Sequence, residues 1–337
     1  MKPLKRILLL ALLIILAACS NDDSDDFNTN NQSGLVENNN GGQNGNDSSS
    51  NNGGNETGGS QEIGNDGEIT LYKVSGSSIT KIKDYQVSGQ NLSYQQDTSK
   101  HNEIWELIKK IVPTNYLSKM NEFLIYSGQA NGTAGFVIET NSDLSKWKMG
   151  IAIDYAYQGG FNTNGELAYT IIHEFGHILT LNNDQLNASI SRENCSNYYP
   201  GEGCANSDAY INKTYQNFWA DIWSQYQEAK NGGQNAMQNF YNTYQDRFLT
   251  QYASTNPGED IAEIFAVFVT RNSGANGSSK AEQKIQLFYN HSELVSIRNF
   301  IRGNLNSKSS RGGFTLPAPG SWKQANRIGN PHKKCGH

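Results

Sequence analysis

The 40 residues before Gly67 are too polar to join a packed core, and this limits what the chain can fold into. From Phe27 to Asp66 almost every residue is Asn, Gly, Ser, Asp or Gln. Such a segment buries too little apolar surface to offset the entropy lost on ordering. The sequence that can fold is therefore the stretch of about 270 residues from Gly67 onward, which is long enough for a hydrophobic core.

The first 18 residues have the composition of a targeting segment. Three basic residues lie within the first six, and the apolar run Ile7–Leu16 is too short to span a bilayer. The run leads into Leu-Ala-Ala-Cys at Cys19, which resembles the lipobox of bacterial lipoproteins. The resemblance implies a signal peptide over residues 1–18, a lipid on Cys19, and a disordered tether over residues 19–66. The protein would then contact the membrane through this anchor alone.

An acidic run follows the predicted anchor. Four of the seven residues in Ser20–Asp26 are aspartate, which resembles the surface-export signal of Bacteroidota lipoproteins. That resemblance implies an outer-membrane lipoprotein exposed at the cell surface. The alternative is that the run is only the solvated start of the tether, with the domain on the periplasmic face.

The balance of charge argues against one class of partner. The chain has 27 Lys and Arg against 32 Asp and Glu, a formal net charge of -5, and the sequence shows no basic cluster. A nucleic-acid partner needs such a cluster, so none is expected.

The periodicity after Gly67 predicts an α+β domain with a small N-terminal sheet and a mostly helical C-terminal half. Short strands are expected at 69–74 and 79–82, so residues 67–98 form either an accessory β segment or the first strands of the main domain, 99–337. Further strands are expected at 123–127, 134–139 and 149–155. Helices are expected at 101–112, 165–181, 208–230, 234–252 and 257–270, with one or two more over 281–305 and an irregular tail over 316–337.

The predicted helix 165–181 contains the pattern HExxH as His173-Glu174-Phe175-Gly176-His177. A spacing of four places both imidazoles one turn apart, where both reach one Zn²⁺ at about 2.0–2.1 Å. Glu174 lies beside the open metal position, where it can take a proton from a zinc-bound water. The alternative, two core histidines beside a glutamate, would bury a charge without an obvious partner.

The residues after the HExxH motif indicate which class of zinc peptidase the chain resembles. A metzincin needs Gly and a third ligand where this chain has Thr180 and Asn183, so that class is excluded. The downstream pattern of Tyr252, Glu259 and Glu263 instead resembles gluzincins, the thermolysin-like zinc peptidases, and most closely the catalytic domain of anthrax lethal factor. The likeness covers mainly 163–181 and 251–268, and the interval from His177 to Glu259 is long for these families.

The gluzincin resemblance implies a zincin-like metallopeptidase domain and a role for each matching residue. Glu259 would be the third zinc ligand, Tyr252 a donor to the oxyanion, and Glu263 an acid that orients a ligand histidine. Two alternatives stay open. Asn256, Pro257 and Glu259 also fit a capping box, which would leave Glu263 as the ligand, and Tyr252 could serve packing alone.

Other candidate residues carry weaker signals. Cys195 and Cys204 flank a turn-rich loop, so a disulfide is expected in an oxidising compartment. His291 is an alternative donor to Tyr252, although a surface position is its default. Trp219 and Trp223, four residues apart, are expected in the core. Near the C-terminus, His332, Cys335 and His337 could bind a soft metal, and the alternative is that they lie in a disordered tail.

Together these patterns predict a zinc-dependent metallopeptidase with one catalytic Zn²⁺ and a protein or peptide substrate. The alternative is a tethered binding module for host protein or glycan, with a zincin-like fold and little turnover. Aromatic residues between 208 and 252 motivate this alternative, because Tyr and Trp suit recognition surfaces.

Overall fold

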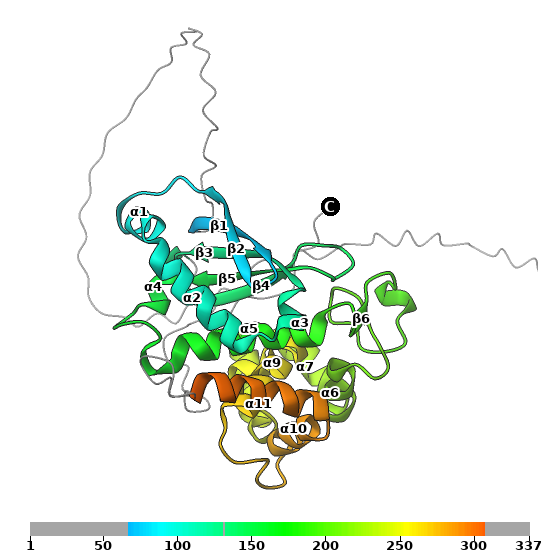
Figure 1. Ribbon diagram of the computed structural model, residues 1–337. Coiled ribbons are helices and arrows are strands. Elements are labelled where there is room, and N and C mark those ends of the chain that lie inside the picture. The colour runs from blue at the N-terminus through cyan, green and yellow to red at the C-terminus, as the bar shows by residue number, and fades with distance from the viewer. Residues whose placement is uncertain (1–66, 131, 307–337) are drawn as a thin grey trace, which may run out of the picture. The chain divides into compact units, whose positions relative to one another are not determined.

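The computed structural model describes residues 67–130 and 132–306 (Figure 1). The chain divides into two units, 1–50 and 51–337, and all described residues lie in the second. The predicted signal peptide, Cys19, the tether and the tail over 316–337 lie outside the described residues, as do His332, Cys335 and His337.

A five-stranded mixed sheet forms the N-terminal part, with strand order β2-β1-β3-β5-β4. β3 and β5 are parallel, and every other neighbouring pair is antiparallel. Since β1 pairs with β3, residues 67–84 belong to the main sheet rather than to an accessory hairpin. β4 ends the sheet on the opposite side from β2. The strands are β1 (Glu68–Ser75), β2 (Ser78–Asp84), β3 (Met120–Tyr126), β4 (Gly135–Glu139) and β5 (Trp147–Ala152).

One face of the sheet packs against helices. Phe123 and Ile125 of β3 share a buried cluster with Ile104 and Ile108 of α2 and with Ile171 of α5. The alternate residues of the strands line the second face. In Figure 1, α2 and α5 lie against the same side of the sheet. This packing holds α5 firmly, so side chains on it can be positioned accurately.

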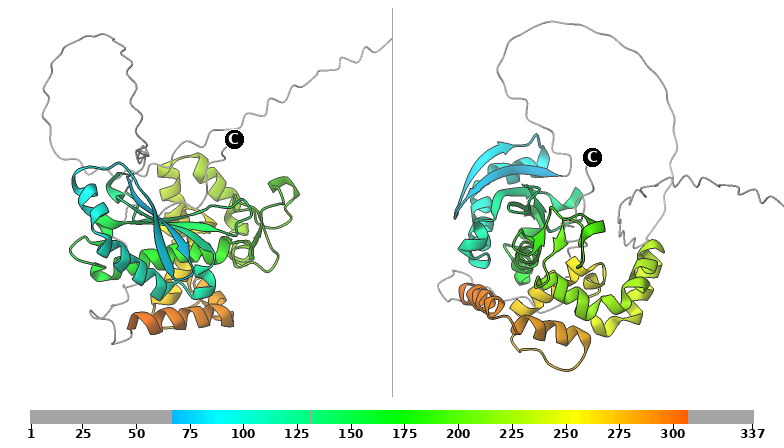
Figure 2. Two further views of the ribbon diagram at one scale, coloured as in Figure 1. Left: turned by 45° about the horizontal axis from the view of Figure 1, so that its top comes forward. Right: turned by 90° about the vertical axis from the view of Figure 1, so that its right-hand side faces the viewer.

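Helices make up most of the C-terminal half, with α9 between α5 and the last two helices (Figures 1 and 2). A small two-stranded sheet of β6 (Leu186–Asn187) and β7 (Cys204–Ala205) lies among them. The α+β class, with a small sheet first and helices later, is confirmed. The helices are α1 (Gly89–Gln96), α2 (Thr98–Ile111), α3 (Thr114–Leu117), α4 (Ile153–Ala156), α5 (Glu166–Leu181), α6 (Tyr210–Phe218), α7 (Trp223–Asn231), α8 (Gln234–Thr243), α9 (Pro257–Thr270), α10 (Lys280–Tyr289) and α11 (Ser292–Asn306).

Two predicted long helices are wrong in extent. The expected helix 208–230 breaks into α6 and α7 around a 3₁₀ turn, Ala220–Ile222, and the expected helix 234–252 ends at Thr243. The first break follows from a tertiary contact: the indole of Trp219 donates to the buried carboxylate of Asp260 at 2.7 Å. Trp219 is fully buried as expected for a core residue, whereas Trp223 is only partly buried.

No helix among residues 67–130 and 132–306 combines the length and the apolar character needed to cross a bilayer.

Buried His101 joins the sheet to the first helices. Its Nε2 donates to the carbonyl of Tyr94 at 2.9 Å, so its Nδ1 is the acceptor for the hydroxyl of Tyr72, 2.7 Å away. Burial lowers the pKa of His101. The imidazole is therefore neutral in the folded protein at a pH where it is protonated in the unfolded chain.

This pKa shift predicts that acid weakens the fold. Because the folded pKa lies below the ordinary value of 6.5, the contribution of His101 is complete above pH 6.5 and is lost as pH falls through the lowered folded pKa. Thermal unfolding between about pH 8 and about pH 5 should show a smaller acid-induced loss for His101→Gln than for the wild type. Equal losses in the two proteins would contradict this assignment.

Candidate metal centre

Helix α5 carries the two histidines on a buried face. The helix begins after Gly165, whose φ of 75° is in the left-handed region that favours glycine. His173 and His177 are both fully buried, and their Nε2 atoms lie 3.1 Å apart. The four-residue spacing thus brings both nitrogens to one point, as the sequence predicts.

Helix α9 brings the third ligand to the same point. Asn256 caps the helix, since its side chain accepts from the backbone N–H of Glu259 at 2.9 Å, and Pro257 follows in the first turn. The side chain of Glu259 turns towards α5, where Oε2 lies 3.1 Å from His173 Nε2 and 3.3 Å from His177 Nε2. The cap therefore engages the backbone of Glu259 and leaves its carboxylate for the metal site.

The three donor atoms have a spacing that suits a metal ion. Their separations are 3.1, 3.1 and 3.3 Å. Two ligands at tetrahedral positions about 2.0–2.1 Å from a zinc ion lie about 3.3 Å apart. His173, His177 and Glu259 are all buried and form a group that can hold a metal ion.

Glu263 lies behind one ligand histidine. Its Oε1 is 2.7 Å from His173 Nδ1. A proton on Nδ1 makes this contact a hydrogen bond to the carboxylate and leaves the Nε2 lone pair facing Glu259 and His177. Glu259 is thus the ligand candidate and Glu263 the orienting acid, and the alternative assignment of Glu263 as the ligand does not fit the geometry.

A glycine inside the motif allows the two helices to approach closely. A Cβ at Gly176 would lie 3.2 Å from the Cα of Ala262 and 3.3 Å from Cδ1 of Phe265. These distances are tighter than ordinary van der Waals contact. The small residues at this crossing let the carboxylate of Glu259 reach the imidazoles from the neighbouring helix.

The site stabilises charge through its contacts. Burial alone lowers the pKa of His173, but hydrogen bonds to Glu259 and Glu263 outweigh burial and raise it to about 10. Burial also disfavours the charged form of Glu259 and raises its pKa, but the neighbouring His177 and His173 outweigh burial and lower the pKa to about 2. The carboxylate is therefore ionised, and the cluster favours positive charge between the three side chains.

Glu174 is the acid whose environment most disfavours its charged form. The side chain is fully buried, and no described residue makes a well-aligned hydrogen bond to either oxygen. Burial raises its pKa well above the ordinary value, although nearby His173 and the backbone of Val137 oppose this shift. A buried carboxyl with so little hydrogen bonding, next to a group that could hold a metal ion, is typical of an active-site acid or base.

Tyr252 lies at the site in a short 3₁₀ turn, Tyr252–Ser254, just before α9. Its ring centroid is 6.0 Å from that of His173. Burial raises the pKa of its phenol well above the ordinary value, and the carboxylates of Glu259 and Glu174 add to the shift. The hydroxyl therefore keeps its proton, and the carboxylate of Glu259 accepts a hydrogen bond from it.

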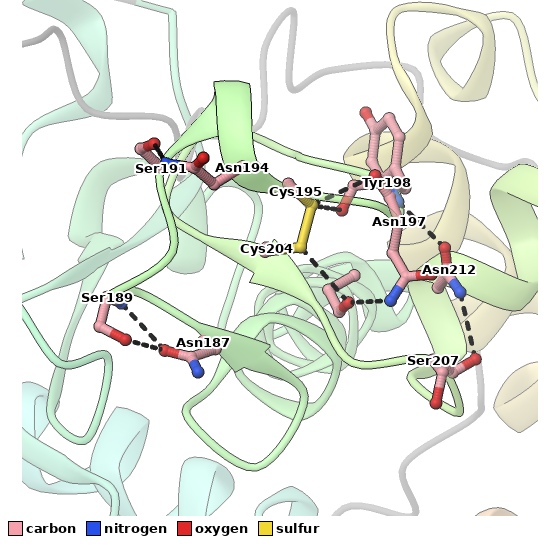
Figure 3. The surroundings of a disulfide bond; sticks show 11 residues. Asn187, Ser189, Ser191, Asn194, Cys195, Asn197, Tyr198, Cys204, Ser207 and Asn212 are labelled. Atoms are coloured by element: carbon pink, nitrogen blue, oxygen red, sulfur yellow. Dashed lines mark hydrogen bonds between the residues drawn. A yellow bond between two sulfur atoms is a disulfide. The ribbon is translucent and has the colours of Figure 1, made fainter.

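The remaining candidates lie elsewhere. Cys195 and Cys204 form a disulfide with their Cα atoms 5.3 Å apart, which closes the loop that follows α5 (Figure 3). His291, the alternative donor, packs edge-on against Tyr210 of α6 with ring centroids 5.0 Å apart.

Two contacts at the site were not predicted from the sequence. The hydroxyls of Tyr169 and Thr250 both donate to Glu263 Oε2, at 3.2 and 2.9 Å. Tyr169 precedes His173 by four residues, so helical periodicity alone places it on the same face. Thr250 lies in an irregular segment, where no periodic signal exists.

The described residues thus form a buried group of two imidazoles and one carboxylate that could hold a metal ion, flanked by the buried carboxyl of Glu174. Comparisons with models of protein families, with curated proteins and with solved structures find no match to the chain.

The helix crossing gives a direct test of the metal centre. Gly176→Leu must push α9 away from α5, which we expect to cost about 1–3 kcal/mol of stability and to weaken metal binding at least about tenfold, as loss of ligand alignment does. Gly303→Leu in α11 is the matched control, because nothing lies within 4 Å of a Cβ there. Zinc titration against a chelator measures both variants. Unchanged affinity in a folded Gly176→Leu protein would contradict the assigned centre.

Proposed function

We propose that this protein is a zinc-dependent metallopeptidase of gluzincin type, with a zincin-like domain. The observation that carries the proposal is the convergence of His173, His177 and Glu259, from two helices, beside the buried carboxyl of Glu174. A structural cluster would not need a further buried acid with so little hydrogen bonding at this position.

The donor set supports zinc. Two imidazoles and one carboxylate make three protein ligands, the number typical of catalytic zinc sites, whereas structural sites take four from the protein. When bound, zinc supplies Lewis acidity that polarises a carbonyl and lowers the pKa of water towards about 7. The hydrogen bond from His173 to Glu263 orients the imidazole for this role.

Glu174 is the proton carrier in the proposed reaction. Its side chain lies beside His173 and Glu259, where as a carboxylate it would take a proton from the attacking water and pass it to the leaving amine. The phenol of Tyr252 keeps its proton and can donate to the oxyanion as charge develops on the carbonyl oxygen. Both the proton transfer by Glu174 and the hydrogen bond from Tyr252 thus use side chains that lie next to His173 and Glu259.

The edge of the sheet supports a peptide as substrate. β4 is the last strand of the sheet, and a Cβ on its first residue, Gly135, would lie 3.3 Å from Cγ of Glu174. An extended peptide can add to such an edge through main-chain hydrogen bonds. A peptide bond in that position would lie next to the proposed proton carrier.

The catalytic proposal predicts a variant that keeps metal and loses turnover. Glu174→Gln preserves size and removes the carboxylate, so zinc content should stay at the wild-type level while hydrolysis falls by about 10²-fold or more. Cleavage of a peptide library, measured with metal analysis of the same protein, tests both. Glu166→Gln, on the first turn of α5, is the control.

Two results would contradict the catalytic proposal. Full activity in Glu174→Gln would exclude the assigned proton carrier. Zinc bound by the wild type without cleavage of any peptide would favour the alternative, a tethered binding module.

We further propose that the domain is held at the outer membrane by the lipid on Cys19 and faces the exterior. The support is the lipobox-like sequence and the acidic run Ser20–Asp26. Protease added to intact cells should digest the domain while a periplasmic marker survives. Cys19→Ala should release the protein from the membrane fraction. Protection of the domain in intact cells would indicate the periplasmic face instead.

A further inference from the structure

Thr250 makes two hydrogen bonds that connect parts of the site. Its hydroxyl donates to Glu263 Oε2 at 2.9 Å and accepts from the backbone N–H of Ala253 at 3.1 Å. Ala253 follows Tyr252 in the turn that precedes α9. One hydroxyl thus contacts both the acid behind His173 and the turn that carries Tyr252.

Glu263 is surrounded by donors. Oε1 faces Nδ1 of His173, and Oε2 receives the hydroxyls of Tyr169 and Thr250. An ionised carboxylate only accepts hydrogen bonds, so all three neighbours can be satisfied at once. With both oxygens engaged, the carboxylate cannot rotate away from the imidazole without breaking several contacts.

A local role would not explain both contacts of Thr250. A threonine that caps a turn uses its oxygen as an acceptor, as the bond from Ala253 does. The second bond, to a carboxylate that is only 1% exposed, adds nothing to the turn. It does restrain the group that sets the proton position on His173.

We propose that Thr250 is a positioning residue of the metal centre. It holds Glu263 against His173 Nδ1 and keeps Tyr252 beside the same histidine, so that the nitrogen and the phenol are aligned together. This inference rests on the proposed function, since it concerns the same zinc site. Tyr169 shares the task at Oε2 of Glu263.

The position of Thr250 links the intervening helices to the site. Phe248, two residues earlier, is buried in the aromatic cluster built by α6, α7 and α8, together with Trp219 and Phe240. The packing of that aromatic cluster around Phe248 therefore fixes the position of Thr250. In this way the 81 residues between His177 and Glu259 contribute to the alignment of the candidate ligands.

The test compares zinc affinity by chelator competition in the metal-loaded protein. Thr250→Val removes the hydroxyl at nearly constant volume and is expected to weaken zinc binding about tenfold, the lower end for loss of an orienting contact. Thr250→Ser keeps the hydroxyl and should retain wild-type affinity. Thr243→Val is the control, because that hydroxyl donates to the carbonyl of Asn239 at the exposed end of α8, within its own helix.

A second readout separates positioning from general stability. The visible spectrum of the Co²⁺-substituted protein reports ligand geometry, and it should change in Thr250→Val and stay unchanged in Thr250→Ser. If Thr250→Val does not fold, Thr250→Ala removes the same hydroxyl without the added methyl group and should show the same weakening.

The outcomes distinguish this inference from the proposed function. Wild-type affinity and an unchanged Co²⁺ spectrum in a folded Thr250→Val protein would overturn the role of Thr250 while leaving the zinc site intact. Failure of the wild type to bind zinc at all would overturn both.

Discussion

The close crossing of α5 and α9 is the contact on which the site depends. Because residue 176 is glycine and residue 262 is alanine, the two backbones come near enough for the carboxylate of Glu259 to meet both imidazoles. A larger residue at either position would widen the gap by more than a ligand bond can absorb. The motif HExxH is therefore only half of the centre, and the second half depends on how tightly another helix packs against the residue between the histidines.

Such tight packing buries charged side chains on two sides of α9, and the partners that stabilise them differ between the two sides. On one side Glu259 and Glu263 face the histidines of α5. On another, the carboxylate of Asp260 meets the ammonium of Lys284 at 2.5 Å and the indole of Trp219. Buried ions need such partners, because removing one partner of a buried pair costs about 3–5 kcal/mol. The lysine pair ties α9 to α10 and thereby supports the helix that carries the ligand.

Local signals explain which parts of this arrangement could be predicted from the sequence. The bounds of α9, 257–270, agree because Asn256 and Pro257 define the start of the helix locally. The sequence could not decide between Glu259 and Glu263, since both lie on one helical face and only the neighbouring helix distinguishes them. The break at Trp219 was missed because its cause, Asp260, lies 41 residues away. Thr250 was missed because an irregular segment has no periodicity.

The long interval between the ligands then has a physical role. It departs from the spacing expected of gluzincins, yet its helices form an aromatic cluster of their own and place Thr250 against Glu263. A shorter connection could bring Glu259 to the histidines, but it would leave one oxygen of Glu263 with Tyr169 alone among the described donors. The segment between the candidate ligands thus supplies one hydroxyl to the acid behind His173.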